Sequence, residues 1–317
     1  MCKILIIGMP DLLLECLRKL LQARKNIVGV ITSPPDDPSY ELAKNFLAAN
    51  NLYHIAHNKN FKDETLLNIV RELEPDIAIV CSFNFLLPKE LYSIPKLGTV
   101  NIHPSLLPDY RGANPYFHVI NNGEKYTGVT FHHIDETFDT GDIIFSEKIE
   151  IQPKDTMGTL FNKINFISAR KCLELIEMVE NGIELPAIEQ DQECPHIAPK
   201  IYNNSPETFI DWTRPAVETE RFVRALNPFF GALTFYNGII LRIWSGRYFD
   251  NINAKFTKPG EIFKVTDKMI MVATGRGVYI PEIVNFGTYM ISDIKDFIEL
   301  TRIKAGDCFT AKQISVA

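Results

Sequence analysis

Apolar residues in the first third of the chain follow two alternating patterns. Continuous apolar runs occupy 3–8, 26–34 and 76–83, as expected of buried strands. Between them, 12–23 and 64–73 carry apolar residues three and four positions apart, the spacing of one face of a helix. Further elements are predicted as a helix at 41–51 and strands at 52–56, 98–105 and 128–134. Strands that alternate with helices in this way predict a Rossmann-like α/β fold, a parallel sheet covered on both faces.

The pattern changes towards the C-terminal half. Residues 155–182 predict one long amphipathic helix, and 184–206 contains four prolines, as in a connection between domains. Beyond residue 207, short apolar runs are separated by turn signals such as Asn237-Gly238. Short strands at regular spacing predict a small β-barrel of the oligonucleotide/oligosaccharide-binding (OB) type. The predicted division is a first domain at 1–183, a linker at 184–206 and an OB-like barrel domain at 207–317.

Length and composition agree with a two-domain globular protein. The chain has 317 residues, 46% of them hydrophobic, and one domain usually takes about 100–200 residues. No apolar run reaches the ~18–20 residues of a membrane helix, and the apolar start at 3–8 is too short for a signal peptide. The six cysteines are scattered without a CxxC pair, which favours a reduced compartment. We therefore expect a cytoplasmic protein without membrane association.

Candidate chemistry is concentrated in residues 101–142. Asn101 and His103 stand two apart at the end of an apolar run, so on a strand their side chains point the same way. Asp139 and Asp142 lie in the segment FDTGD, from which a strand at 128–134 leads back to the same sheet edge. An amide, an imidazole and a carboxylate at one place can move protons and polarise a carbonyl. This combination predicts an enzyme.

The same residues also have structural explanations. A histidine on a strand is more often structural than catalytic, and the Asp, Thr and Gly of FDTGD are also turn formers. Ser105, which follows Pro104, fits a hydrogen bond that holds its own loop. The pairing of Asn101 with His103 at the end of a buried strand favours catalysis over the structural explanation.

Other chemistries lack their motifs. Gly8 stands alone after the first strand, where a dinucleotide-binding unit carries GxGxxG, and no GxxxxGK[ST] loop is present. His132 and His133 are adjacent, so a strand would point them to opposite faces, and no further ligand stands at metal-binding spacing. No GxSxG or reactive cysteine motif indicates covalent catalysis. We expect neither a dinucleotide nor a metal.

Several motifs together identify a family. The pattern N-x-H-x-S-L-L-P-x-Y-R-G at 101–112, the TGVT at 127–130 and the FDTGD at 138–142 resemble the 10-formyltetrahydrofolate-dependent formyltransferases. The similarity extends to SFNFLLPKELYSIP at 82–95 and to RALNPFFGA at 224–232. The C-terminal part resembles the barrel domain of methionyl-tRNA formyltransferases and of related sugar-nucleotide formyltransferases. The first predicted domain would then be the formyltransferase catalytic domain.

The resemblance implies a donor and a set of site residues. Asn101, His103 and Asp139 match the catalytic residues of the family, and 10-formyltetrahydrofolate would be the formyl donor, with no metal. Transfer to an amine passes through a tetrahedral oxyanion, which Asn101 and His103 would stabilise while His103, oriented by Asp139, moves the proton. The predicted donor-binding residues are Phe85, Leu86, Leu87, Asp135, Phe138 and Asp142. The predicted acceptor-binding residues are Ser105, Tyr110, Arg111 and Tyr116.

The acceptor is predicted from charge. Methionyl-tRNA formyltransferases carry a basic insertion after the second strand, whereas 31–46 here has no Arg and is acidic, and the chain has a net charge of −6. A surface that holds RNA phosphates should be basic. We therefore predict an amino sugar of a sugar nucleotide as the acceptor, in a chain that could form a homodimer, and we disfavour tRNA. The alternatives are methionyl-tRNA formyl transfer to the initiator tRNA, formyltetrahydrofolate hydrolysis and formylation of a carrier-bound aminoacyl group.

Overall fold

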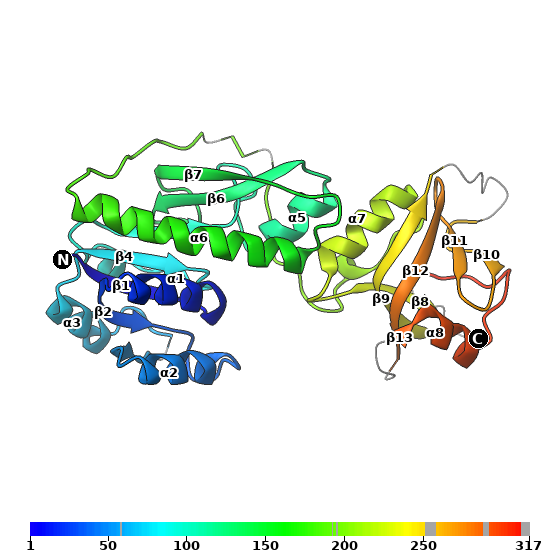
Figure 1. Ribbon diagram of the computed structural model, residues 1–317, viewed down its shortest axis with the longest axis horizontal. Helices are drawn as coiled ribbons and strands as arrows, with labels where there is room; N and C mark the ends of the chain where they lie inside the picture. The colour runs from blue at the N-terminus through cyan, green and yellow to red at the C-terminus, as the bar shows by residue number, and fades with distance from the viewer. Residues whose placement is uncertain (58, 192, 195, 251–257, 288–291, 312–317) are drawn as a thin grey trace. The chain divides into compact units, whose positions relative to one another are not determined.

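The chain forms two compact units. The computed structural model describes residues 1–57, 59–191, 193–194, 196–250, 258–287 and 292–311 (Figure 1). The first unit comprises Met1–Pro115, Tyr126–Glu150 and Phe161–Ala198, and the second comprises Tyr116–Lys125, Ile151–Leu160 and Pro199–Ala317. Because segments from the middle of the chain belong to the second unit, each unit is assembled from more than one stretch of sequence.

The first unit is built on a seven-stranded sheet in the order β3-β2-β1-β4-β5-β6-β7. Its strands are β1 (Lys3–Gly8), β2 (Asn26–Ile31), β3 (His54–Ile55), β4 (Ile77–Cys81), β5 (Thr99–His103), β6 (Tyr126–His133) and β7 (Ile143–Glu150). The first five strands of this order run parallel, and β6 and β7 are antiparallel to their neighbours. The predicted Rossmann-like fold is confirmed, with an antiparallel extension at one edge.

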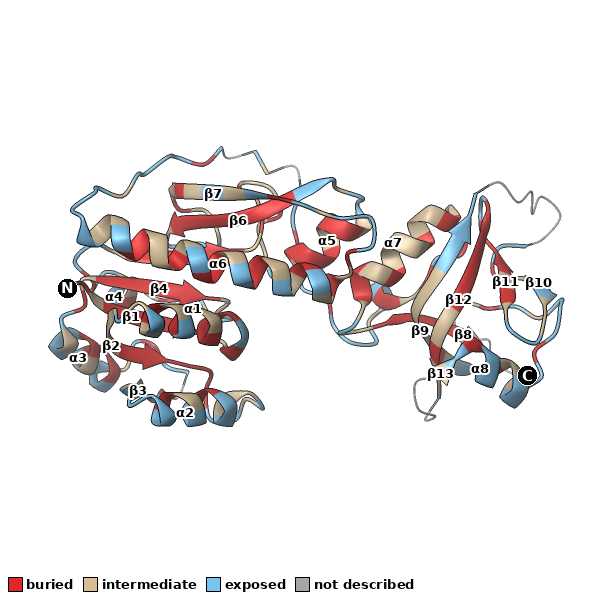
Figure 2. Cartoon of the chain, viewed as in Figure 1, coloured by how far each residue is buried: buried red, intermediate tan, exposed pale blue. Residues whose placement is uncertain are grey.

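Burial explains the continuous apolar runs of the central strands. Residues of β1 and β4 are almost completely buried, and β4 appears red in Figure 2. A strand covered on both faces needs apolar residues at every position, without alternation. The ends of β4 and β5 lie side by side, with Val80 opposite Asn101. This register places the polar end of β5 at the carboxyl edge of the parallel strands, where ligands of such sheets bind.

The helices follow the predicted apolar spacing. They are α1 (Pro10–Gln22), α2 (Tyr40–Ala49), α3 (Glu64–Leu73), α4 (Lys89–Tyr92), α5 (Pro115–Asn121) and α6 (Met157–Glu180). Helix α1 buries Leu13, Leu17 and Leu20 on one face. Asp63 caps the start of α3, where its carboxylate accepts a hydrogen bond from the Thr65 N–H. Within the described ranges, no helix is both long enough and apolar enough to cross a lipid bilayer.

The second unit contains an antiparallel sheet in the order β10-β11-β12-β9-β8, with β13 paired to β12. Its elements are η1 (Pro206–Thr208), α7 (Ala216–Leu226), β8 (Ala232–Tyr236), β9 (Ile239–Phe249), β10 (Ile262–Val265), β11 (Ile270–Ala273), β12 (Val278–Phe286), β13 (Ser292–Asp293) and α8 (Ile294–Thr301). Asn237 and Gly238 both have positive φ, which is the conformation that a tight hairpin between β8 and β9 requires. The sheet is consistent with the small barrel that the sequence predicts.

Candidate active site

Strand β5 places Asn101 and His103 on one side of the sheet edge, as predicted. The antiparallel register sets Asn101 opposite His132 and His103 opposite Thr130 on β6. The His103 side chain is almost completely buried. Its Nε2 atom lies 2.9 Å from the Tyr110 carbonyl oxygen, and its Nδ1 atom lies 3.3 Å from Asp139 Oδ1. Because a carbonyl oxygen can only accept, Nε2 carries a hydrogen, and protonation of Nδ1 creates an ion pair with Asp139.

Asp139 is fixed by several donors. The Gly112 N–H donates to Asp139 Oδ2 at 3.0 Å, and Asn101 Nδ2 donates to Oδ1 at 3.3 Å. Burial alone would raise the pKa of Asp139, but the charge and hydrogen bond of His103, together with His132 and the Gly112 N–H, lower this pKa to about 2. The structure therefore brings Asn101, His103 and Asp139 together and holds the carboxylate ionised.

The loop that carries Asp139 depends on a close backbone approach. Asp139 has a positive φ of 59°. A Cβ atom at Gly141 would lie 1.9 Å from the His133 carbonyl oxygen, a distance at which atoms overlap, so only glycine fits. The His133 N–H donates to the Asp142 carbonyl oxygen at 2.9 Å, which closes the loop. FDTGD is thus both the predicted turn and the segment that delivers Asp139.

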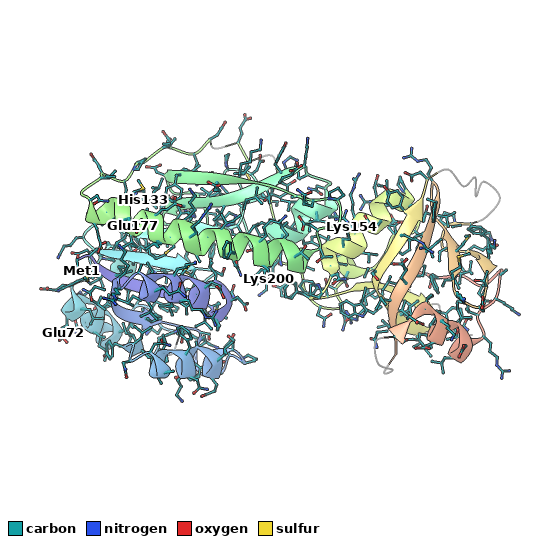
Figure 3. All side chains as sticks on the ribbon, viewed as in Figure 1. Met1, Glu72, His133, Lys154, Glu177 and Lys200 are labelled. Atoms are coloured by element: carbon teal, nitrogen blue, oxygen red, sulfur yellow. The ribbon has the colours of Figure 1, made fainter. Side chains whose placement is uncertain are left out.

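His132 belongs to the site, a role that its place beside His133 in the sequence does not indicate. Its side chain is buried, and its Nε2 atom lies 3.0 Å from Asn101 Nδ2 and 3.8 Å from Asp139 Oδ1. His133, labelled in Figure 3, instead places its Nε2 atom 3.3 Å from the Pro186 carbonyl oxygen. The predicted divergence of the two side chains on a strand is seen, and among the described residues no group of three or more potential ligands could hold a metal ion.

Gln190 is a second residue that the sequence analysis missed. This buried side chain donates from Nε2 to the carbonyl oxygens of Asp139 and Gly141 at 3.1 and 2.6 Å. Its Oε1 accepts from Arg111 at 2.7 Å. The surrounding segment also pairs with the loop that follows β5, since the Tyr110 N–H donates to the His196 carbonyl oxygen at 2.7 Å. Gln190 therefore ties together the two loops that surround Asp139.

The predicted donor-binding residues border a cleft of about 60 Å³ at the site. The cleft is lined by Val80, Phe83, Phe85, Leu86, Leu87, Asn101, His132, Ile134, Thr137, Phe138 and Asp139. Four of the six predicted residues are in this lining. Asp135 instead accepts hydrogen bonds from the Thr137 N–H and the Thr140 hydroxyl, and Asp142 contributes its carbonyl oxygen to the loop closure. Donor binding by these residues stays a prediction.

Apolar rings support one wall of the cleft. Phe83 and Phe85 pack with their ring centroids 5.3 Å apart, and His57 lies against both. The His57 Nε2 atom lies 2.7 Å from the Thr32 carbonyl oxygen, while burial lowers the pKa of His57 below its usual range. A neutral, anchored imidazole therefore packs beneath the rings that line the cleft.

The predicted acceptor-binding residues are mostly engaged within the protein. Ser105 is buried and donates to the Asp109 carbonyl oxygen at 2.6 Å, as the structural explanation anticipated. The Tyr110 ring is buried and stacks on His196 with centroids 5.2 Å apart. Arg111 donates to Gln190, and Tyr116 is buried in α5. Their contact with an acceptor stays a prediction.

Asn101, Asp139 and His132 line the cleft, whereas His103 does not. Both hydrogens of the Asn101 amide are directed at partners, one to Asp139 Oδ1 and one to His132 Nε2. The oxyanion contacts predicted for Asn101 and His103 would require N–H groups that here point to protein acceptors. The oxyanion role of these two residues stays a prediction. Asn101 Oδ1, the acceptor atom of the same amide, has no hydrogen-bond donor among the described residues.

The second unit contains a cavity of about 750 Å³. Its charged lining residues are Lys154, Glu220, Arg221, Arg224, Arg247 and Glu282. Each acid is paired with an arginine, Glu220 with Arg224 at 2.6 Å and Glu282 with Arg247 at 3.5 Å. Lys154, labelled in Figure 3, and Arg221 have no ion-pair partner in the part of the chain that the structure describes. The cavity wall therefore has an excess of positive charge.

The fold and the site define a Rossmann-like protein with a buried amide, imidazole and carboxylate at a cleft. Comparison with known proteins identifies its family. Residues 2–175 match the model of the formyl transferase family, and residues 204–301 match that of the formyl transferase C-terminal domain. The chain belongs to the formyl transferase family. The predicted enzyme class and the predicted donor, 10-formyltetrahydrofolate, are confirmed by this membership.

Similar curated proteins carry one particular name. Methionyl-tRNA formyltransferase of Alkaliphilus oremlandii is 32% identical over 96% of this chain and 98% of its own length. The enzyme of the same name from Clostridioides difficile is 34% identical over 96% of this chain and 98% of its own length. The similarity therefore includes both units.

Solved structures share the fold at lower identity. An N-formyltransferase from Helicobacter canadensis, in complex with folinic acid and dTDP-3-aminofucose, superimposes with a TM-score of 0.67 at 19% identity and covers 89% of this chain and 98% of that one. HypX from Aquifex aeolicus in complex with tetrahydrofolic acid gives 0.62 at 18% identity, over 94% of this chain and 47% of that one. At such identities the structures support the fold alone.

The acceptor prediction was wrong. Full-length relatives at 30–34% identity are methionyl-tRNA formyltransferases, whereas the H. canadensis N-formyltransferase in complex with dTDP-3-aminofucose shares 19%. The amino sugar and the prediction that disfavoured tRNA are therefore both overturned. The acidic loop was misread because its charges are used locally: Asp36 pairs with Lys59 at 2.6 Å, and Asp37 accepts from the Ser39 N–H at 2.8 Å. A net count over a segment does not reveal such pairing.

Proposed function

We propose that this protein transfers the formyl group of 10-formyltetrahydrofolate to the α-amino group of methionine on initiator tRNA. The observation that carries the proposal is the similarity, over almost the whole chain, to methionyl-tRNA formyltransferases. Both substrates are cytoplasmic molecules, so the proposal includes a cytoplasmic location. We retain the predicted division as part of it, with a catalytic domain at 1–183, a linker at 184–206 and a barrel domain at 207–317.

In the proposed reaction the amine nitrogen attacks the formyl carbon. A new C–N bond forms, the bond between the formyl carbon and the folate N10 breaks, and one proton passes from the amine to N10. Asn101 Oδ1 accepts one N–H of the amine at the cleft and orients its lone pair. Asp139 lines the same cleft and receives the proton from the amine. His103 contacts Asp139 from the side away from the cleft lining, and the ion pair that the two residues form when Nδ1 is protonated holds the proton near the reacting atoms.

The cavity of the second unit supports an RNA acceptor. Lys154 and Arg221, which have no ion-pair partner within the described ranges, are suited to phosphate oxygens. Trp244 and Tyr248 in the same wall offer aromatic surfaces. The overall charge of the unit is nearly balanced, but affinity for RNA depends on where the positive groups gather. A cation cluster of this kind offsets the acidic net charge of the chain.

The test is single-turnover formyl transfer with 10-formyltetrahydrofolate and methionyl initiator tRNA. We expect transfer to methionine on the tRNA, and a rate that falls steeply with salt because phosphate contacts release counterions. Free methionine and an uncharged tRNA serve as controls for the amine and for the RNA. Donor turnover without a formylated product would support hydrolysis instead, and the absence of any donor turnover would contradict the proposal.

A further inference from the structure

We infer that His132 is a positioning residue: as a neutral hydrogen-bond acceptor, it fixes the Asn101 amide with Oδ1 turned to the cleft. The inference rests on the proposed function for its catalytic consequence, but the hydrogen-bond arrangement itself stands on geometry. His132 and Asn101 are directly opposite each other on antiparallel β6 and β5. Their side chains are therefore held by two hydrogen-bonded strands, which restricts the distance between the imidazole and the amide.

The tautomer of His132 follows from its two contacts. Nδ1 lies 2.8 Å from the His133 carbonyl oxygen, and because a carbonyl only accepts, Nδ1 carries the hydrogen. A neutral ring then presents an unprotonated Nε2, which lies 3.0 Å from Asn101 Nδ2. Burial, followed by the positive charge of His103, lowers the pKa of His132 to about 4, so the neutral form is present at physiological pH. His132 is thus an acceptor at the position where the Asn101 N–H arrives.

The two acceptors around Asn101 select one orientation of its amide. With Nδ2 facing His132 Nε2 and Asp139 Oδ1, both N–H groups are satisfied. A half-turn of the amide would place Oδ1 against a nitrogen lone pair and a carboxylate, which are both repulsive contacts. Among the described residues no donor reaches Asn101 Oδ1. Asn101 lines the cleft, and its Oδ1 is not among the buried side-chain atoms without a partner, so we assign this acceptor to a substrate N–H.

His132→Leu and His132→Gln separate the acceptor role from packing. Leucine fills the buried space and accepts no hydrogen bond, whereas the glutamine amide oxygen reaches the position of Nε2. We expect His132→Leu to lower kcat for transfer at least tenfold with little change in KM for the donor, and His132→Gln to recover most of this loss. Equal activity of the leucine variant and the wild type would overturn the inference, as would equal loss in both variants.

His133→Leu is the matched control. His133 is the neighbour of His132 on β6 and contacts the Pro186 carbonyl oxygen instead of the site. The same substitution one position along the strand should leave kcat near the wild-type value. Thermal unfolding of all three variants shows whether a loss of kcat reflects unfolding. A comparable kcat loss in His133→Leu would indicate a general effect on the strand and would overturn the role assigned to His132.

A spectroscopic arm tests the arrangement without any substrate. The ¹⁵N chemical shifts of His132, assigned by comparison with His132→Gln, report which ring nitrogen is protonated. We expect a hydrogen on Nδ1 and none on Nε2 between pH 6 and pH 8. A hydrogen on Nε2 would overturn the inference even if transfer to tRNA is observed. Conversely, a wild-type protein that shows the expected tautomer but formylates no tRNA would contradict the proposed function alone.

Discussion

His103 Nδ1 lies 3.3 Å from Asp139 Oδ1, and both side chains are largely buried. The two residues come from different parts of the chain, the end of β5 and the loop between β6 and β7. The pairing keeps a carboxylate ionised in surroundings that would otherwise favour its neutral form. A buried acid and base in contact, at the edge of a cleft, form a pair suited to proton transfer.

The first prediction concerns the base of this pair. His103→Ala should reduce single-turnover transfer by about 10²–10⁴-fold, the usual contribution of a positioned proton-transfer group. His103→Asn is the matched variant, because its amide reaches the position of Nδ1 beside Asp139 but cannot carry the proton. We expect it to be nearly as slow. Rates in either variant close to that of the wild type would remove His103 from the mechanism, provided that thermal unfolding shows both variants to be folded.

The second prediction concerns the pH dependence of stability. The pKa of Asp139 is lowered to about 2 in the folded chain, below its ordinary value of about 3.9. Its contribution to stability is therefore complete above about pH 4 and is lost as the pH falls through 2. A lowering of this size corresponds to about 2–3 kcal/mol. Asp139→Asn removes the titrating group. The difference in unfolding free energy between wild type and variant should therefore shrink by about that amount as the pH falls from 5 to 2.

Urea unfolding of the wild type and Asp139→Asn between pH 5 and pH 2 measures this difference. Other carboxylates titrate in the same range, but they do so in both proteins and cancel in the comparison. A difference that stays constant over the whole range would mean that the carboxylate is not held ionised by its neighbours. The amide variant should also be deficient in formyl transfer, since it cannot accept a proton.

The third prediction concerns the cations of the second unit. Lys154→Ala and Arg221→Ala each remove a positive charge from the cavity wall. If these groups contact phosphates, each change should weaken tRNA binding and reduce the slope of log affinity against log salt by roughly 1. Lys268→Ala, at an exposed position outside the cavity lining, is the control. An unchanged salt slope in both cavity variants would exclude phosphate contacts at this wall.

The sequence predicts the fold and three site residues because their signals are local. Asn101 and His103 lie on one strand, and their spacing places them on one side of it. Asp139 is marked by its turn-forming segment. His132 and Gln190 could not be found in this way, because their roles arise from cross-strand register and from a contact across about fifty residues of sequence. No local pattern of charge or periodicity encodes such a contact.

The acceptor predicted from the charge of 31–46 was wrong for a related reason. Composition reports how many charges a segment has, and the structure reports which of them are paired. Asp36 is paired with Lys59 in the first unit, whereas Lys154 and Arg221 have no ion-pair partner among the described residues of the second. The two cations are 67 positions apart in sequence, so no window of the sequence contains both. An RNA surface assembled from distant residues is invisible to a segment-by-segment charge count.

The last prediction concerns Gln190, whose N–H groups hold the Asp139 and Gly141 carbonyl oxygens. Gln190→Glu keeps the shape of the side chain but replaces the donor by an acceptor, so two buried carbonyls lose their partner. We expect unfolding free energy to fall by about 1–3 kcal/mol, the cost of leaving a buried polar group unsatisfied. Gln190→Ala should lower the unfolding free energy by a similar amount, without the repulsion between the glutamate oxygen and the two carbonyl oxygens. Because the Asp139 loop borders the cleft, KM for the folate donor should rise in both variants. Urea unfolding and donor titration measure the two effects, and a glutamate variant with wild-type stability and KM would show that the loop is held without Gln190.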